Sequence, residues 1–114
     1  MKRYIYHLAL RSAWEAAKRE GEPYRRSTIE RSLDDEGFIH CSYREQVQGV
    51  ADRFYHGRTD VLLLTIDTSK LDAEVRTENR FPHIYGPLPS EAVVRVEPVA
   101  CRDDGRLLLS ALLD

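Results

Sequence analysis

The feature that most constrains this chain is a near-continuous apolar run, Val-Leu-Leu-Leu-Thr-Ile, at residues 61–66. A short run of this kind without polar alternation is typical of a strand that is buried in a sheet. Residues 107–109 form the other notable apolar cluster, which is also only as long as a strand. A membrane-spanning helix needs roughly 18 consecutive apolar residues, so we expect no membrane partner.

Length and composition favour a single domain over residues 1–114. Apolar residues make up 42% of the chain and charged residues 32%, which is too much hydrophobic content for a disordered chain. No repeat, low-complexity tract or flexible linker divides the sequence. A chain of this size normally builds one hydrophobic core. We therefore expect one cooperative unit, and the sequence carries no signal for a particular oligomeric state.

Charge and cysteine usage narrow the choice of partners and compartment. A formal net charge of -2 attracts a polyanion weakly, and the one basic patch consists of Arg25, Arg26 and Arg31. We do not expect a nucleic-acid partner. The N-terminus lacks the apolar stretch and cleavage site of a signal peptide, and Cys41 and Cys101 fit free thiols. These features indicate a cytoplasmic protein.

Hydrophobic periodicity and turn residues predict a mixed order of strands and helices. Strands are expected at residues 3–9, 38–41, 61–66, 92–96 and 107–109, the last after a hairpin turn at residues 104–105. Helices are expected at residues 12–20, just before Gly37, and at residues 42–57. This order favours an α+β fold over a doubly wound sheet.

Capping residues and one apolar stripe define the expected helices. Ser12 and Ser42 are each followed three residues later by Glu, the spacing of a capping box, and Ser32 is followed in the same way by Asp35. Trp14 is expected in the core. An apolar stripe at helical period in the third helix is predicted to pack on the sheet; it consists of Val47, Val50, Ala51 and Phe54.

Residues 70–89 are predicted to form a long irregular loop. They carry Pro82, Gly86, Pro87 and Pro89, a composition that resists regular strand pairing. Ordered loops of this length often have a function.

Three histidines are candidate functional residues because each lies beside aromatic residues. His7 follows Tyr-Ile-Tyr, His40 lies in Glu-Gly-Phe-Ile-His-Cys-Ser at residues 36–42, and His83 lies in Phe-Pro-His-Ile-Tyr-Gly-Pro-Leu at residues 81–88. Imidazole donates, accepts and titrates near neutral pH, so three in one cleft would suit proton transfer or the binding of ribose and phosphate. The alternative is that each histidine fills a half-buried strand position.

Strand alternation at residues 38–42 argues against a cysteine–histidine pair. His40 shares a face with Phe38 and Ser42, whereas Cys41 points the other way. Ser42 is expected to cap the following helix, whose N-terminus suits an anion. The histidines and cysteines lack the close spacing of the usual metal motifs, so we expect no metal.

Together, these segments resemble a bacterial family of short proteins that is known as a domain of unknown function and is grouped by fold with the ADP-ribosyltransferases. The resemblance covers about residues 4–98 and rests on the motifs at residues 36–42 and 81–88. It implies small antiparallel or mixed sheets with two to three helices around a cleft. In the larger superfamily this cleft binds nicotinamide adenine dinucleotide (NAD).

The resemblance also implies roles for individual residues. His7 matches a polar residue on the first strand that holds a ribose, and His40 with Ser42 matches a later strand that precedes a helix. With His83, these two histidines are the candidate catalytic residues, because such a site must fix the ribose and shield the positive charge that develops on it. The candidate ligand-binding residues are Ser42, Tyr85, Tyr6 and Glu78.

Three functions are compatible with these observations. The leading one is a transferase of ADP-ribosyl or phosphoribosyl type that uses NAD or a related ADP-ribose compound as its substrate. A non-catalytic module would bind a nucleotide in the same cleft without turnover, and the two differ in whether Glu78 reaches the histidines. A protein-interaction module would use the histidines for packing, and it predicts that Phe81, Ile84 and Tyr85 are exposed together.

Overall fold

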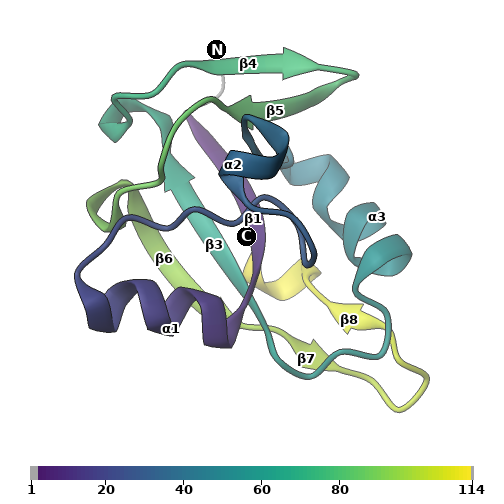
Figure 1. Cartoon of the computed structure of the whole chain (residues 1–114). Helices are drawn as coiled ribbons and strands as arrows, with labels where there is room; N and C mark the ends of the chain where they lie inside the picture. The colour runs from purple at the N-terminus through teal and green to yellow at the C-terminus, as the bar shows by residue number, and fades with distance from the viewer. Residues whose placement is uncertain (1–2, 114) are drawn as a thin grey trace.

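The computed structural model describes residues 3–113 and has an α+β fold with small antiparallel sheets (Figure 1). The strands are β1 (Tyr4–Leu10), β2 (Ile39–His40), β3 (Val61–Asp67), β4 (Val75–Glu78), β5 (Phe81–Ile84), β6 (Val93–Pro98), β7 (Ala100–Cys101) and β8 (Leu107–Leu108). The helices are α1 (Arg11–Glu20), α2 (Leu33–Glu36) and α3 (Arg44–Phe54). The predicted α+β class is confirmed. Among the described residues, no helix is long and apolar enough to span a bilayer.

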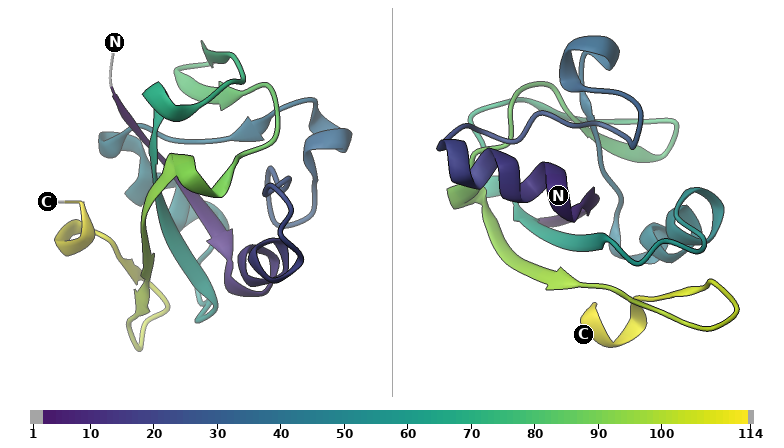
Figure 2. Two further views of the ribbon diagram at one scale, coloured as in Figure 1. Left: turned by 90° about the vertical axis from the view of Figure 1, so that its left-hand side faces the viewer. Right: turned by 60° about the horizontal axis from the view of Figure 1, so that its bottom comes forward.

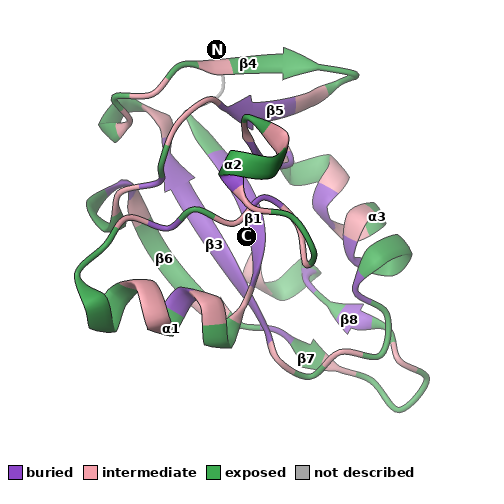
Figure 3. Cartoon of the chain, in the orientation of Figure 1, coloured by how far each residue is buried: buried purple, intermediate pink, exposed green. Residues whose placement is uncertain are grey.

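Strand β3 is the centre of the main sheet, whose order is β1-β3-β6, and every residue of β3 is buried (Figure 3). One core cluster, on the side of α1, includes Trp14 and Ile39. A second cluster includes Val47 of α3 and Leu107 of the C-terminal hairpin. Figure 2 shows α1 and the C-terminal segment on opposite sides of the sheet. Because both faces are covered, residues 61–66 show no polar alternation.

Residues 70–89 are not the irregular loop that their prolines predict. They include β4 and β5, and β5 is the middle strand of a second sheet with the order β2-β5-β4. The turn residues Asn79 and Arg80 both have positive φ, 51° and 73°, as in a type I′ hairpin turn. Pro82 is tolerated in the middle strand because its carbonyl makes the ladder contact, accepting from the Cys41 N–H at 3.0 Å.

Two predicted helix caps are wrong. Helix α1 follows β1 directly and has Leu10 at its N-cap, so Ser12 already lies in the first turn of the helix. Helix α3 has Tyr43 at its N-cap, and the Tyr43 N–H donates to Gln46 Oε1 at 2.9 Å. The capping box of Ser32 and Asp35 at the start of α2 is confirmed.

Ser42 instead joins the two sheets. Its N–H donates to the Tyr6 carbonyl at 2.7 Å, and the Tyr6 N–H donates to the Ser42 carbonyl at 2.8 Å. A backbone held in this bridge is extended, which explains why the helix begins one residue later than its sequence predicts. The bridge also fixes β2, and hence His40, against β1.

The apolar stripe of α3 packs on the sheet only in part. Val47 and Ala51 are buried and Val50 is half-buried, but Phe54 is 61% exposed. Phe54 lies at the C-terminal end of the helix and lines a hollow beside His40.

Candidate functional site

His7 is buried, and both of its ring nitrogens have hydrogen-bond partners. Its Nδ1 is 2.6 Å from the His40 carbonyl and its Nε2 is 2.9 Å from the Tyr24 hydroxyl. A carbonyl can only accept, so Nδ1 carries the proton and the Tyr24 O–H donates to Nε2. Burial lowers the pKa of His7 to about 4. The imidazole is therefore neutral at physiological pH and has no nitrogen left for a ligand.

Tyr6 points to the other face of the sheet from His7, as alternation along a strand requires. It is buried in the cluster that contains Val47 and Leu63. The structure therefore does not bring Tyr6 together with the three candidate histidines. Ser42 is also buried, and its backbone forms the bridge to Tyr6.

His40 and His83 come together on the outer face of the second sheet. They are directly opposite each other in the register of β2 and β5, and their ring centroids are 5.6 Å apart. Phe38 stacks on His83 at 4.0 Å with an interplanar angle of 8°, and Phe81 lies 5.2 Å from His40. Burial lowers the pKa of both histidines, and at His40 the neighbouring His83 adds to this effect. Glu36 opposes the lowering of the pKa at His40, and Glu78 and Glu36 oppose it at His83.

Glu78 and Tyr85 extend this group of rings. Glu78 Oε1 is 3.8 Å from His83 Nδ1, so the carboxylate lies near this histidine but beyond hydrogen-bond distance. The Tyr85 ring is 5.7 Å from Phe38, and the Arg76 guanidinium lies over it at 4.8 Å. Ile84, by contrast, is fully buried, so the exposed patch predicted for a protein-interaction module is not present.

His40 also borders an open hollow of about 530 Å³, which is large enough for a nucleotide. The segment before α2, the end of α3 and the residues after it form the other walls. Glu36 lies beside His40, and two guanidinium groups and several apolar side chains complete the lining. The lining residues are Thr28, Ile29, Glu30, Arg31, Glu36, His40, Val50, Phe54, Tyr55 and Arg58.

Sequence reasoning missed most of this hollow. In the sequence, Arg31 is only part of a basic patch, and the helical stripe predicts that Phe54 packs on the sheet. Ile29 and Arg58 lie in no motif, whereas Glu36 opens the motif at residues 36–42 that contains His40. Two signals therefore point to the hollow: this motif, and the end position of Phe54 in the stripe, where a helix can extend beyond its packing surface.

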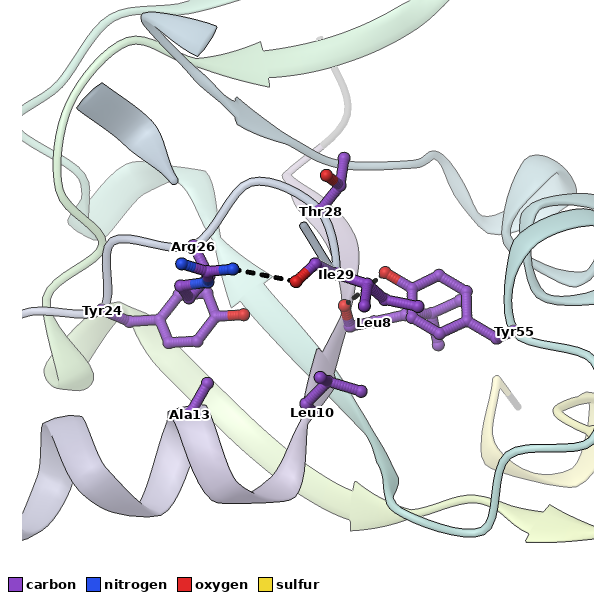
Figure 4. Close-up of a pocket in the computed structure, with 8 residues that line it drawn as sticks. All are labelled: Leu8, Leu10, Ala13, Tyr24, Arg26, Thr28, Ile29 and Tyr55. Carbon is purple, nitrogen blue, oxygen red and sulfur yellow. Dashed lines mark hydrogen bonds between the residues drawn. The ribbon is translucent and has the colours of Figure 1, made fainter. Parts of the chain in front are cut away.

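A small pocket lies next to the hollow and shares Thr28, Ile29 and Tyr55 with it (Figure 4). Its volume of about 10 Å³ is at the limit of what holds one water. The Arg26 guanidinium donates to the Ile29 carbonyl at 2.8 Å, and the Tyr55 hydroxyl donates to the Leu8 carbonyl at 3.2 Å. The first bond lies within the segment before α2, and the second joins the residue that follows α3 to β1.

No group of three or more His, Cys, Asp or Glu side chains among residues 3–113 is arranged to hold a metal ion. Cys41 points away from His40 into the core, as predicted, and burial raises the pKa of its thiol.

Comparison with known proteins shows which family the chain resembles. The family described as "Protein of unknown function (DUF952)" matches residues 8–96. The chain belongs to the DUF952 family. The DUF952 match includes His40, Glu78 and His83 and begins one residue after His7. No curated protein matches the chain.

Solved structures of protein CC0527 from Caulobacter crescentus resemble this DUF952 protein over nearly its whole length. A crystal structure and a crystal structure of a double mutant have TM-scores of 0.81 and 0.82, with 30% identity over 96% of this chain and 97% of the other. A solution NMR structure has a TM-score of 0.76, with 30% identity over 97% of both chains. The similarity therefore extends to the strands and helices around the hollow.

Proposed function

We propose that this DUF952 protein binds a nucleotide of the ADP-ribose type, such as NAD, in the hollow beside His40. The observation that carries the proposal is the hollow itself, about 530 Å³ in volume and lined by His40, two arginines and apolar side chains, of which Phe54 is exposed. Nucleotide sites need this combination, because a base or a nicotinamide ring packs on apolar surface while ribose and phosphate need donors.

The lining residues have separate uses in this proposal. Arg31 and Arg58 suit the diphosphate; Arg58 is held in place by Asp60 through contacts of 3.0 and 2.8 Å. Phe54 offers an exposed ring for stacking. His40 has a neutral imidazole at physiological pH, which both donates to and accepts from ribose hydroxyls.

The resemblance to the ADP-ribosyltransferases supports the same ligand class, with one change of role. A ribose-holding residue on the first strand would be His7, but both nitrogens of His7 have protein partners. We assign His7 the indirect role of holding the His40 backbone, to which it donates, and we assign the direct contact with the ribose to His40.

Cleavage of the bond between ribose and nicotinamide is a second candidate function, favoured by the carboxylate of Glu36 beside His40 in the hollow. The C1′–N bond would break with its electron pair passing to the nicotinamide nitrogen. A water or acceptor oxygen would form the new bond to C1′ and lose its proton to Glu36. The carboxylate would also stabilise the positive charge that develops on the ribose.

Calorimetric titration with ADP-ribose, NAD and AMP tests the proposal. We expect ADP-ribose and NAD to bind, and we expect His40→Gln to weaken binding about tenfold, which corresponds to about 1.4 kcal/mol. His56→Gln is the matched control, because His56 is an exposed histidine that does not line the hollow. Absence of binding at millimolar ligand, in protein with a native circular dichroism spectrum, contradicts the proposal. Release of nicotinamide from NAD is measured in parallel and decides the second candidate.

A further inference from the structure

We propose that Glu78 is a positioning residue for His83 and that the two side chains form a carboxylate–imidazole pair that supplies acid–base chemistry next to the hollow. The inference deepens the proposed function and rests on it only for the identity of the ligand.

The first observation is an unpaired nitrogen. The His83 side chain is 9% exposed, and its Nδ1 is buried without a hydrogen-bond partner among the described residues. A buried ring nitrogen in this state costs free energy, so a nearby carboxylate is significant. Glu78 Oε1 lies 3.8 Å from it, which is too long for a hydrogen bond.

The second observation is that the imidazole is packed in the sheet whereas the carboxylate is half-exposed at its edge. His83 lies on β5, the middle strand of its sheet, and Phe38 stacks flat on it at 4.0 Å. Glu78 lies on β4, at the edge of the sheet, and its side chain is 48% exposed. A rotation of the Glu78 side chain that moves its carboxylate about 1 Å closer to His83 Nδ1 brings the two atoms within hydrogen-bond distance. The Nδ1–H then donates a charge-assisted hydrogen bond to the carboxylate.

The surrounding charges agree with this arrangement. His40 faces His83 from β2, Arg76 lies opposite it on β4, and Glu36 approaches from α2. Burial lowers the pKa of His83, while Glu78 and Glu36 oppose that effect. The imidazole is thus neutral at physiological pH, with a carboxylate on the Nδ1 side.

A fixed tautomer gives His83 a defined chemistry. When Nδ1–H donates to Glu78, the lone pair on Nε2 is free to accept a proton. In that step an O–H or N–H bond of the donor breaks, its electron pair stays on the donor atom, and a new N–H bond forms at Nε2. The resulting imidazolium is stabilised by the Glu78 carboxylate, as in other carboxylate–histidine pairs.

Long-range ¹H–¹⁵N NMR on the full, ligand-free chain tests the inference, using Glu78→Gln and Glu78→Leu. We expect the neutral His83 ring of the wild type to carry its proton on Nδ1. Glu78→Gln keeps an acceptor but removes the charge, so it should lower the pKa of His83 by about 0.5 or more. Glu78→Leu removes the acceptor, so it should shift the ring toward the Nε2–H tautomer.

Glu74→Gln is the control, because Glu74 pairs with Arg76 in the same region and makes no contact with His83 among the described residues. It should leave the His83 tautomer unchanged. An Nε2–H tautomer in the wild type overturns the inference, as does an equal His83 titration midpoint in wild type and Glu78→Gln. Since no nucleotide is present, this result is independent of whether ADP-ribose or NAD binds.

Discussion

Among single residues, His7 has the most completely determined environment, because both of its ring nitrogens have partners. Its strand position and aromatic neighbours suggest a catalytic group, and the resemblance to the ADP-ribosyltransferases suggests the same. What the sequence could not reveal is Tyr24, which lies 17 positions away in a segment without regular structure and donates to His7 Nε2. The difference between a ligand-binding histidine and one that holds the fold together depends on that single hydroxyl.

Removing this network should destabilise the protein. Tyr24→Phe leaves a buried imidazole acceptor without its donor, and we expect a loss of about 1–2 kcal/mol in the free energy of unfolding. His7→Ala also removes the ring and leaves two buried partners unpaired, so we expect a loss of about 3 kcal/mol or more. Urea denaturation of both variants and of the double variant measures the coupling. Strictly additive losses would contradict a shared hydrogen bond.

Acid should also destabilise the folded state through His7. The pKa of His7 is about 4 in the folded protein and about 6.5 when unfolded, so between these values the unfolded chain binds the extra proton. The stability contribution is full above pH 6.5 and falls as the pH drops toward 4, by about 3 kcal/mol at 1.36 kcal/mol per pH unit. Urea denaturation at pH 7.5, 6.5, 5.5 and 4.5 should show a flatter profile for His7→Gln than for the wild type. Parallel profiles would refute this assignment.

At the scale of elements, the strand-forming apolar runs were predictable and the second sheet was not. Two apolar runs predict strands by their composition alone, at residues 61–66 and 107–109. Both predictions are confirmed by β3 and β8. The β4–β5 hairpin was missed because Asn-Arg is not the usual signal of a two-residue turn and because Pro82 lies in its second strand. The pairing of His40 with His83, and the approach of Glu78, depend on this hairpin.

The turn of that hairpin carries strain that a single substitution should relieve. Arg80 has a φ of 73°, which costs a residue with a Cβ more than it costs glycine. Its carbonyl, which accepts from Gln46 Nε2, is kept in any substitution. We therefore expect Arg80→Gly to raise the free energy of unfolding by about 0.5–1 kcal/mol. Arg80→Val, with a branched side chain at the same backbone position, should lower it; equal stability of the two variants would contradict the strained turn.

At the scale of the whole molecule, the main sheet couples two cores. The cluster around Trp14 and the cluster around Val47 both include residues of β1 and β3, so loss of one should remove support from the other. The apolar run predicted a buried strand, but the hollow could not be predicted. Its walls come from separate short segments between residues 28 and 58, and their arrangement is set only when these segments pack on the sheets.

A substitution in one core should therefore be detected from the other. Val47→Ala removes two buried methyl groups, and we expect it to lower the free energy of unfolding by about 2 kcal/mol. Trp14 fluorescence reports on the opposite face of the sheet, and its urea midpoint should move together with the midpoint from far-UV circular dichroism. Separate midpoints would show that the two cores unfold independently.

The most direct test of the central claim is an NMR titration of the full chain with NAD, following backbone amide shifts. The account predicts saturable shifts concentrated at the walls of the hollow, at residues 28–31, 36–40 and 50–58. In His40→Gln the same shifts should need an about tenfold higher NAD concentration for half-saturation. Shifts absent at millimolar NAD, or clustered away from these residues, would contradict a nucleotide site beside His40.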